Sequence, residues 1–282
     1  MARIVLGHRD GALATRLART VLSELSNEWP DLQLVPRTLA SEPTAADDPV
    51  LRALAGGQLG LAVVACETLP APLPADLTLV AVSRRLEPRL ALVTKQAKSL
   101  DALPDGATLG VGAERDIPFL ASGFPGMRAE RVGSDVDRAL ARLAVGELDA
   151  LVLPASLLIM MERRDHIRAL LEPEALPPAP GQGSLALVAR ADDDLAAEVA
   201  YTLQHRPSFD RVRAERAFAA GLPGRALGAL ASVDHDGELS LFGAVAVGTT
   251  TLQANVSGEA REAEELGSEL AKDVALQLES LG

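Results

Sequence analysis

Short apolar runs alternate with amphipathic segments along the first two thirds of the chain. The run RIVLG (3–7) predicts a buried strand. The residues that follow carry an apolar side chain every three or four positions, at Leu13, Leu17, Val21, Leu22 and Leu25, which predicts a helix. Further apolar runs, LGLAVVA (59–65) and LALVT (90–94), are typical of strands buried inside a sheet. This alternation predicts two successive α/β units.

The pattern changes after Asp192. Two helical segments meet at Pro207, and the stretch 226–246 alternates around the turn DHDGE as a β-hairpin does. The last segment, 259–281, is an amphipathic helix with acidic residues in its first turns, where they suit the helix dipole. These segments predict a smaller α+β unit at the end of the chain.

The stretch LPPAPGQGSLAL (176–187) leads from the second α/β unit into an apolar strand. Proline fixes φ and removes a hydrogen-bond donor, while glycine reaches backbone conformations closed to other residues. The stretch is therefore interpreted as a stiff, shaped connector. An ordinary tight loop before a core strand is the alternative, which these residues alone leave open.

Composition narrows the function classes. The chain has 282 residues, of which 48% are hydrophobic, so it is long and apolar enough to form hydrophobic cores. Its formal charge of −12 and its aromatic content of 2% disfavour nucleic acid as a partner. Cys66 is the only cysteine, which fits a reducing compartment. Because neither a signal-peptide core nor a membrane span is recognised, a cytoplasmic protein without membrane partners is expected.

Four stretches together resemble the hydroxymethylbilane synthase family, also called porphobilinogen deaminase. The strongest are the connector (176–187) and RAERAFAAGL (213–222), and the others are GHRDGALA (7–14) and VGELDALVLPAS (145–156). The chain is identified as a divergent member of this family.

The resemblance implies a fold of three domains. Two periplasmic-binding-protein-like α/β lobes with mixed sheets would hold the active cleft between them, and a small α+β third domain would follow. On this basis the first lobe comprises 1–87 and 185–206, the second lobe 88–184, and the C-terminal domain 207–282. The connector would return the chain from the second lobe to the first and set how the lobes face each other.

The family's enzyme condenses porphobilinogen into a linear tetrapyrrole, and an Asp beside the cationic intermediate is essential to that chemistry. The matching stretch here is VACETLP (64–70), in which Thr68 occupies the Asp position and Glu67 the adjacent Lys position. Because neighbouring residues on a strand end point to opposite sides, Glu67 is not expected to replace the Asp.

The family also attaches a dipyrromethane cofactor to a cysteine in its third domain. Arg225 or Ala226 lies where that thiol would be, so no such cofactor is predicted. Cys66 falls on the first-lobe stretch just described and is interpreted as a small buried core residue.

Arg9 and Arg115 are the candidates for substrate binding, because Arg holds carboxylates by a planar, permanently charged fork. Their alternative is a role as ordinary surface arginines. Three more arginines match basic positions of the family and can equally support the lobe: Arg84, Arg85 and Arg89. No metal site is predicted, since neither His8 nor His166 has partners at ligand spacing.

Three hypotheses remain. The first is a paralogue with a degenerate active site, in which synthase activity is lost or nearly lost and a pyrrole or other small carboxylate binds between the lobes of a monomer. The second is an active synthase that works by a variant site. The third is a cytoplasmic small-anion-binding protein.

Overall fold

The computed structural model describes residues 2–40, 48–133 and 135–280. The chain forms two compact units. The first comprises Met1–Arg85 and Ser184–Val212, and the second comprises Leu86–Gly183 and Arg213–Gly282. Each unit contains an α/β lobe with a mixed sheet, and a small α+β portion completes the second, so the predicted fold class is confirmed.

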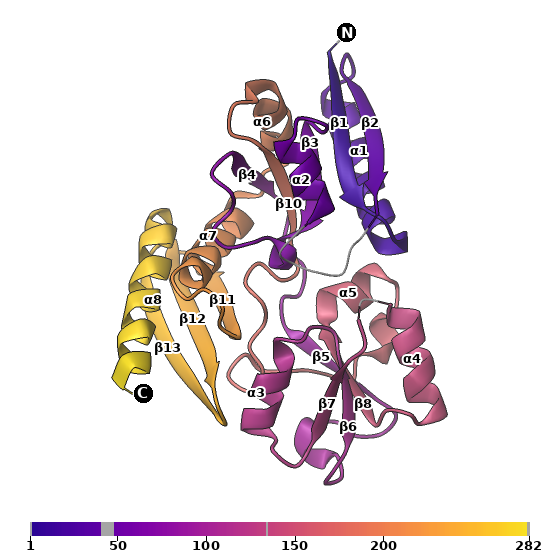
Figure 1. The fold of residues 1–282 in the computed structure, drawn as a ribbon, viewed down its shortest axis with the longest axis vertical. Helices are drawn as coiled ribbons and strands as arrows, with labels where there is room; N and C mark the ends of the chain where they lie inside the picture. Colours follow the sequence, from indigo (N-terminus) through magenta and orange to yellow (C-terminus); the bar gives the residue numbers. More distant parts are fainter. Residues whose placement is uncertain (1, 41–47, 134, 281–282) are drawn as a thin grey trace. The chain divides into compact units, whose positions relative to one another are not determined.

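The sheet of the first unit has five strands in the order β2-β1-β3-β10-β4 (Figure 1). The strands are β1 (Arg3–Arg9), β2 (Gln33–Leu39), β3 (Leu61–Ala65), β4 (Leu77–Val82) and β10 (Leu185–Arg190). β1 pairs in parallel with β2 and β3, whereas β10 runs antiparallel to β3 and β4. The helices are α1 (Ala12–Glu28), α2 (Pro49–Ala55), the 3₁₀ turn η1 (Cys66–Thr68) and α6 (Asp194–Tyr201).

Both faces of this sheet are buried, which explains the continuous apolar runs in its strands. One face packs against α2 and the first part of α7 (Arg206–Ala220), through residues such as Leu54 and Val212. The other face packs against α1 and α6, through residues such as Leu25 and Val199. α7 begins one residue before Pro207, which therefore lies in the first turn, where a helix tolerates proline.

The sheet of the second unit has the order β7-β6-β8-β5-β9. Its strands are β5 (Leu90–Thr94), β6 (Thr108–Val111), β7 (Arg128–Arg131), β8 (Ala150–Pro154) and β9 (Ala169–Leu170), with the helices and 3₁₀ turns η2 (Leu100–Ala102), α3 (Asp116–Gly123), α4 (Val136–Val145), α5 (Ala155–Met160) and η3 (Arg164–His166). β6 is parallel to β7 and β8, and β5 is antiparallel to β8 and β9. The two lobes thus share one plan, in which the fourth strand of each sheet, β10 or β5, runs antiparallel to both of its neighbours.

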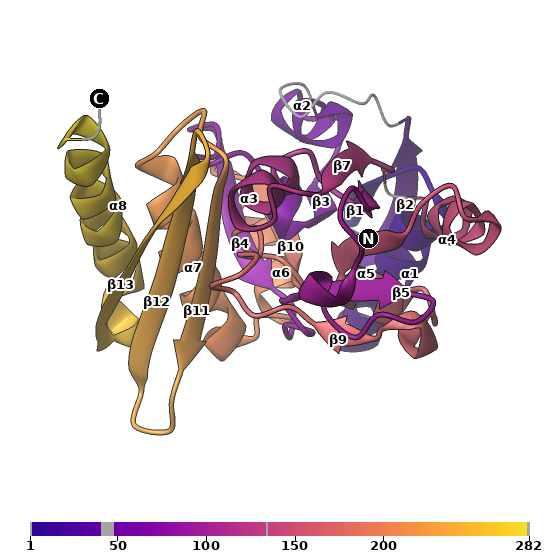
Figure 2. The ribbon, with the colours of Figure 1, turned by 90° about the horizontal axis from the view of Figure 1, so that it is seen from below.

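The C-terminal residues form an antiparallel sheet, β11 (Leu227–Val233), β12 (Glu238–Val247) and β13 (Thr250–Glu259). One face packs against α7 and α8 (Ala263–Ser280), which follows the 3₁₀ turn η4 (Ala260–Glu262) and lies along the sheet in Figure 2. Phe242, Ala244 and Ala246 of β12 join the core around β6 and α3. This shared core groups 213–282 with 86–183, while the division into three domains stays a prediction.

The connector is shaped, as its residues predict. Gly181 and Gly183 have φ values of 80° and 89°, in the left-handed region that favours glycine. A Cβ on Gly183 would lie 3.2 Å from the carbonyl oxygen of Leu86. Gln182 is buried, and its Nε2 donates a hydrogen bond of 2.6 Å to the Pro88 carbonyl. These contacts favour the shaped connector over an ordinary tight loop.

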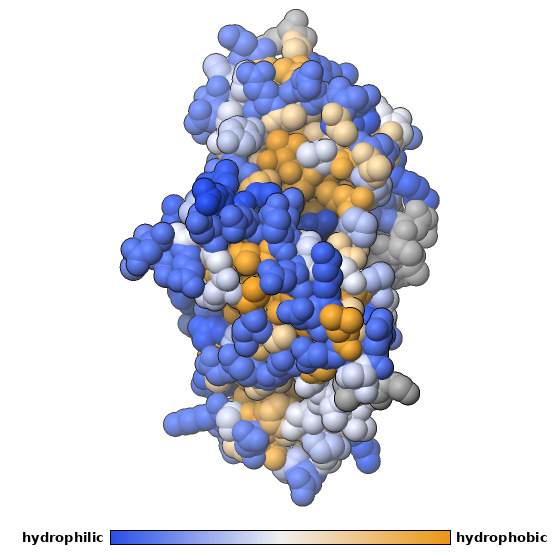
Figure 3. Space-filling model, turned by 90° about the vertical axis from the view of Figure 1, so that its left-hand side faces the viewer, coloured by the Kyte–Doolittle hydropathy of each residue, from blue (hydrophilic) through white to orange (hydrophobic). Residues whose placement is uncertain are grey.

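The surface is mixed in character. On the face in Figure 3, apolar residues gather in patches that hydrophilic side chains interrupt. Across the described ranges of the chain, no helix has both the length and the apolar composition that a membrane span requires.

Candidate functional site

Arg9 ends β1, and its guanidinium is fixed on one side. Nη2 pairs with Oδ2 of Asp48, while Asp48 Oδ1 accepts a hydrogen bond of 2.9 Å from the N–H of Val50 and caps α2. The Arg9 side chain is 29% exposed. No other hydrogen bond of this guanidinium is formed with the described residues. One side of Arg9 is therefore available to an anion.

His8 precedes Arg9 and is buried. Its Nδ1 lies 2.7 Å from the Arg9 carbonyl oxygen, and its Nε2 lies 3.2 Å from Oγ1 of Thr38 on β2. Both ring nitrogens are thus engaged in holding the end of the sheet. Among residues 2–40, 48–133 and 135–280, no group of three or more His, Cys, Asp or Glu side chains is placed to hold a metal ion.

Glu67 and Thr68 lie in the 3₁₀ turn η1, directly after β3. Glu67 was expected to have strand geometry, in which neighbours point to opposite sides, and this expectation is wrong because the strand ends at Ala65. Oγ1 of Thr68 donates a hydrogen bond of 2.8 Å to the Ala65 carbonyl. Thr68 therefore stabilises the turn and supplies no negative charge.

The carboxyl of Glu67 has an unusual environment. Burial raises its pKa to about 7, against the smaller opposing effects of its own backbone N–H and of Arg85 and Arg9. Oε2 is buried and has no hydrogen-bond partner among the described residues. Glu67 is therefore a proton-exchanging carboxyl near neutral pH, close enough to two arginines to feel their charge.

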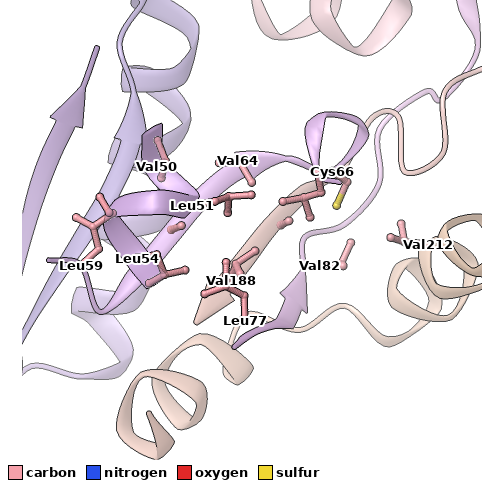
Figure 4. Packing of buried hydrophobic residues seen from close by; sticks show 14 residues of the cluster. Val50, Leu51, Leu54, Leu59, Val64, Cys66, Leu77, Val82, Val188 and Val212 are labelled. Carbon is pink, nitrogen blue, oxygen red and sulfur yellow. The ribbon is translucent and has the colours of Figure 1, made fainter. Parts of the chain in front are cut away.

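Cys66 is fully buried in the first unit. Its N–H donates a hydrogen bond of 2.9 Å to the Ser184 carbonyl. Figure 4 shows its sulfur among the apolar side chains of the cluster that includes Val64, Val82 and Val212. This agrees with the prediction of a small core residue.

Arg115 is held by the second unit itself. Nε donates to the Leu227 carbonyl at 2.8 Å, Nη2 to the Pro177 carbonyl at 2.9 Å, and Nη1 to Oδ1 of Asp116 at 2.7 Å. The guanidinium also lies 5.2 Å from the ring centre of Phe119. Burial lowers the pKa of Arg115, although Asp116 opposes this effect. Its role in ligand binding stays a prediction, and its observed contacts are those of a structural tie.

Arg225 and Ala226 lie between α7 and β11. Arg225 is exposed, and the carbonyl of Ala226 accepts a hydrogen bond of 2.9 Å from the N–H of Ala246. Neither residue offers a nucleophilic sulfur, and the chain's one thiol is buried in the other unit. The residues present therefore do not fit a dipyrromethane bound through a thioether.

Sequence reasoning missed two residues at these positions. Asp48, the partner of Arg9, was detectable because Asp followed by Pro is a common start of a helix. Glu215 is fully buried and accepts hydrogen bonds from the N–H groups of Gly181 and Ala231. Nothing in the local pattern distinguishes Glu215 from an exposed helical Glu.

A family profile described as "Porphobilinogen deaminase, dipyromethane cofactor binding domain" matches residues 4–198. The chain belongs to the porphobilinogen deaminase family. A porphobilinogen deaminase of Thermus thermophilus is 38% identical over 98% of this chain and 97% of its own length. A porphobilinogen deaminase of Deinococcus radiodurans is 32% identical over 97% of this chain and 96% of its own length. The family's activity is a transferase step of tetrapyrrole biosynthesis.

Solved structures of solute-binding proteins also resemble the chain. The methionine-binding protein MetQ covers 71% of this chain and 89% of its own, with a TM-score of 0.49 and 13% identity. DctP7, a Bordetella pertussis solute receptor that binds pyroglutamic acid, covers 77% of this chain and 83% of its own, with a TM-score of 0.48 and 12% identity.

Proposed function

We propose that this chain is a porphobilinogen deaminase paralogue that has lost, or nearly lost, synthase activity. It binds a small carboxylate ligand, pyrroles included, reversibly and without a covalent dipyrromethane. The observation that carries the proposal is the location of the only thiol: Cys66 is fully buried in an apolar cluster. A buried thiol in apolar surroundings is neither ionised nor accessible, so it cannot attack a pyrrole substrate.

The first unit supports the binding half of the proposal. Arg9 keeps a partly exposed guanidinium that Asp48 orients, and an oriented arginine is suited to a ligand carboxylate. Thr68, at the position of the family's Asp, has no charge with which to stabilise a cationic intermediate. The family scaffold is therefore retained, while two parts of its chemistry are missing.

Glu67 favours a second candidate, an active synthase with a variant site. Its carboxyl lies in the same turn as Thr68, and its raised pKa of about 7 is suited to proton transfer at neutral pH. This candidate still needs a primer that is attached without an accessible thiol. For this reason the paralogue is preferred.

Incubation of the purified chain with porphobilinogen separates the two candidates. Intact-mass measurement and an aldehyde stain would detect a bound dipyrrole, and oxidation would reveal porphyrin. The Thermus thermophilus relative, assayed in parallel, serves as the positive control. For the paralogue we expect no mass increase and no porphyrin, together with reversible porphobilinogen binding that Arg9→Gln weakens.

A stoichiometric adduct with porphyrin formation would overturn the paralogue and support the synthase. In that case Glu67→Gln should abolish turnover if Glu67 acts as the carboxylate. An unmodified chain that also fails to bind porphobilinogen and small carboxylates would contradict the binding half of the proposal.

A further inference from the structure

The start of α7 is tied to the end of β4 in the first unit. The N–H of His205 donates to the Val82 carbonyl at 2.9 Å, and the N–H of Arg85 donates to Oγ of Ser208 at 2.9 Å. Arg84 lies between Val82, the last residue of β4, and Arg85, so its backbone is held beside the first turn of α7. In Figure 4, Val82 and Val212 lie close together where β4 and α7 pack.

His205 is oriented by Ser208. Its Nδ1 lies 2.8 Å from Oγ of Ser208. Because that oxygen already accepts the Arg85 N–H, the hydroxyl hydrogen can be donated to Nδ1. The neutral ring then carries its proton on Nε2, which is a donor without a partner among the described residues.

Arg211 follows Ser208 by three residues and therefore lies on the same face of α7, one turn further along. Its Nε is buried and has no hydrogen-bond partner in the described parts of the chain. A buried guanidinium N–H without an acceptor is costly, so an external acceptor would be favourable here. Arg84 is exposed and likewise forms no side-chain hydrogen bond or ion pair with described residues.

The surrounding charges leave this cluster positive. Burial, then the charges of Arg84 and Arg211, lower the pKa of His205. Asp210 precedes Arg211, but its Oδ2 binds Arg206 at 2.8 Å. The first turn of α7 adds the positive end of a helix dipole. Like charges are thus gathered here in a chain whose formal net charge is −12.

We propose that Arg84, His205 and Arg211 form a binding site for a doubly charged oxyanion of the phosphate type. The two guanidinium groups and the Nε2–H of His205 would donate to its oxygens, and the bound anion would satisfy Nε of Arg211. This proposal goes beyond the proposed function, because it uses none of Arg9, Glu67 and Thr68.

Inorganic phosphate is the probe that tests the site. Proton NMR would follow the C2–H signals of the four histidines, with His205→Gln used to assign the relevant one. We expect saturable phosphate binding that shifts the His205 signal and raises its pKa, because the anion offsets the repulsion from the arginines. Acetate, with a single charge, should bind more weakly.

Arg211→Gln should weaken phosphate binding by about tenfold or more, as expected for loss of a charged hydrogen bond. Arg84→Gln, at an exposed position, should weaken phosphate binding as well. Arg138→Gln is the control, since Arg138 is an exposed arginine of α4 and forms no side-chain hydrogen bond or ion pair with the described residues. The proposal is overturned if phosphate leaves the His205 signal unchanged, or if all three variants weaken binding equally.

Discussion

The carboxylate of Glu215 and the N–H of Gly181 form a buried hydrogen bond of 2.6 Å. Glu215 lies on α7, and Gly181 lies in the connector with φ at 80°. The other carboxylate oxygen accepts a hydrogen bond of 2.7 Å from the N–H of Ala231 on β11. One buried side chain therefore joins a helix, a sheet and the connector within the second unit.

We predict that Glu215→Ala lowers the free energy of unfolding by about 3 kcal/mol, because it leaves two buried N–H groups without acceptors. Glu215→Gln keeps one acceptor oxygen and should cost less. Urea unfolding followed by circular dichroism measures both. Glu198→Ala, at an exposed position of α6, is the control and should change little. An unchanged midpoint for Glu215→Ala would show that these hydrogen bonds do not stabilise the fold.

Arg115→Met should also destabilise the chain, by about 3 kcal/mol, since it leaves two carbonyl oxygens and the buried Asp116 without their cation. Burial already raises the pKa of Asp116, against the effect of Arg115. The double variant Arg115→Met/Asp116→Asn should therefore recover part of the loss, because no unpaired carboxylate remains buried. Thermal unfolding of both variants provides the measurement.

If Arg115 instead acts as a ligand-binding surface arginine, Arg115→Met would keep the wild-type melting temperature and lose only anion binding. Arg138→Met, at an exposed position, provides the reference for replacing an arginine that forms no side-chain hydrogen bond or ion pair with the described residues.

More of the fold than of the candidate site could be predicted from the sequence. Apolar runs predict strands such as β3, and apolar residues at helical spacing predict helices such as α1. Both patterns arise because a buried face of a strand or helix requires apolar side chains. The prolines and glycines of the connector likewise indicate a shaped segment. The contacts of Arg115 were not predictable, since its acceptors on Leu227 and Pro177 are 112 and 62 residues away. The strand geometry assumed for Glu67 was wrong, because a turn of 3₁₀ helix follows β3 there, while the role of Glu67 stays a prediction.

Glu67 should make stability depend on pH. Its pKa is about 7 in the folded chain against 4.5 as the ordinary value, so the folded state binds more protons between these limits. The free energy of unfolding should fall as the pH rises from 4.5 to 7, by about 3 kcal/mol from this group. Glu67→Gln should lack this component and exceed the wild type in stability above pH 7.

The measurement is urea unfolding of both proteins at several pH values. The difference between their free energies isolates Glu67 from the other titrating groups. A difference that stays constant across this pH range would mean that Glu67 titrates normally.

The thiol of Cys66 should not react with thiol reagents in the folded chain. Because the side chain is 0% exposed, a thiol reagent such as Ellman's reagent should react only after unfolding, with one equivalent per chain. Rapid stoichiometric labelling of the native protein would contradict this and would remove the main support for a non-synthase role. Cys66→Ala should leave reversible porphobilinogen binding intact, since the sulfur is buried among apolar side chains.

Thr68→Asp places a carboxylate at the position that the sequence predicts for the family's acid, and we expect no tetrapyrrole from this variant. The new carboxylate lies beside Glu67, so the two negative charges oppose each other and raise the pKa of one of them further. It also removes the hydroxyl that donates to the Ala65 carbonyl. No accessible thiol appears, so intact mass should show no adduct and oxidation no porphyrin. Thr68→Asn is the uncharged control. Tetrapyrrole formation by Thr68→Asp alone would contradict the proposal that an accessible thiol is required for synthase activity in this chain.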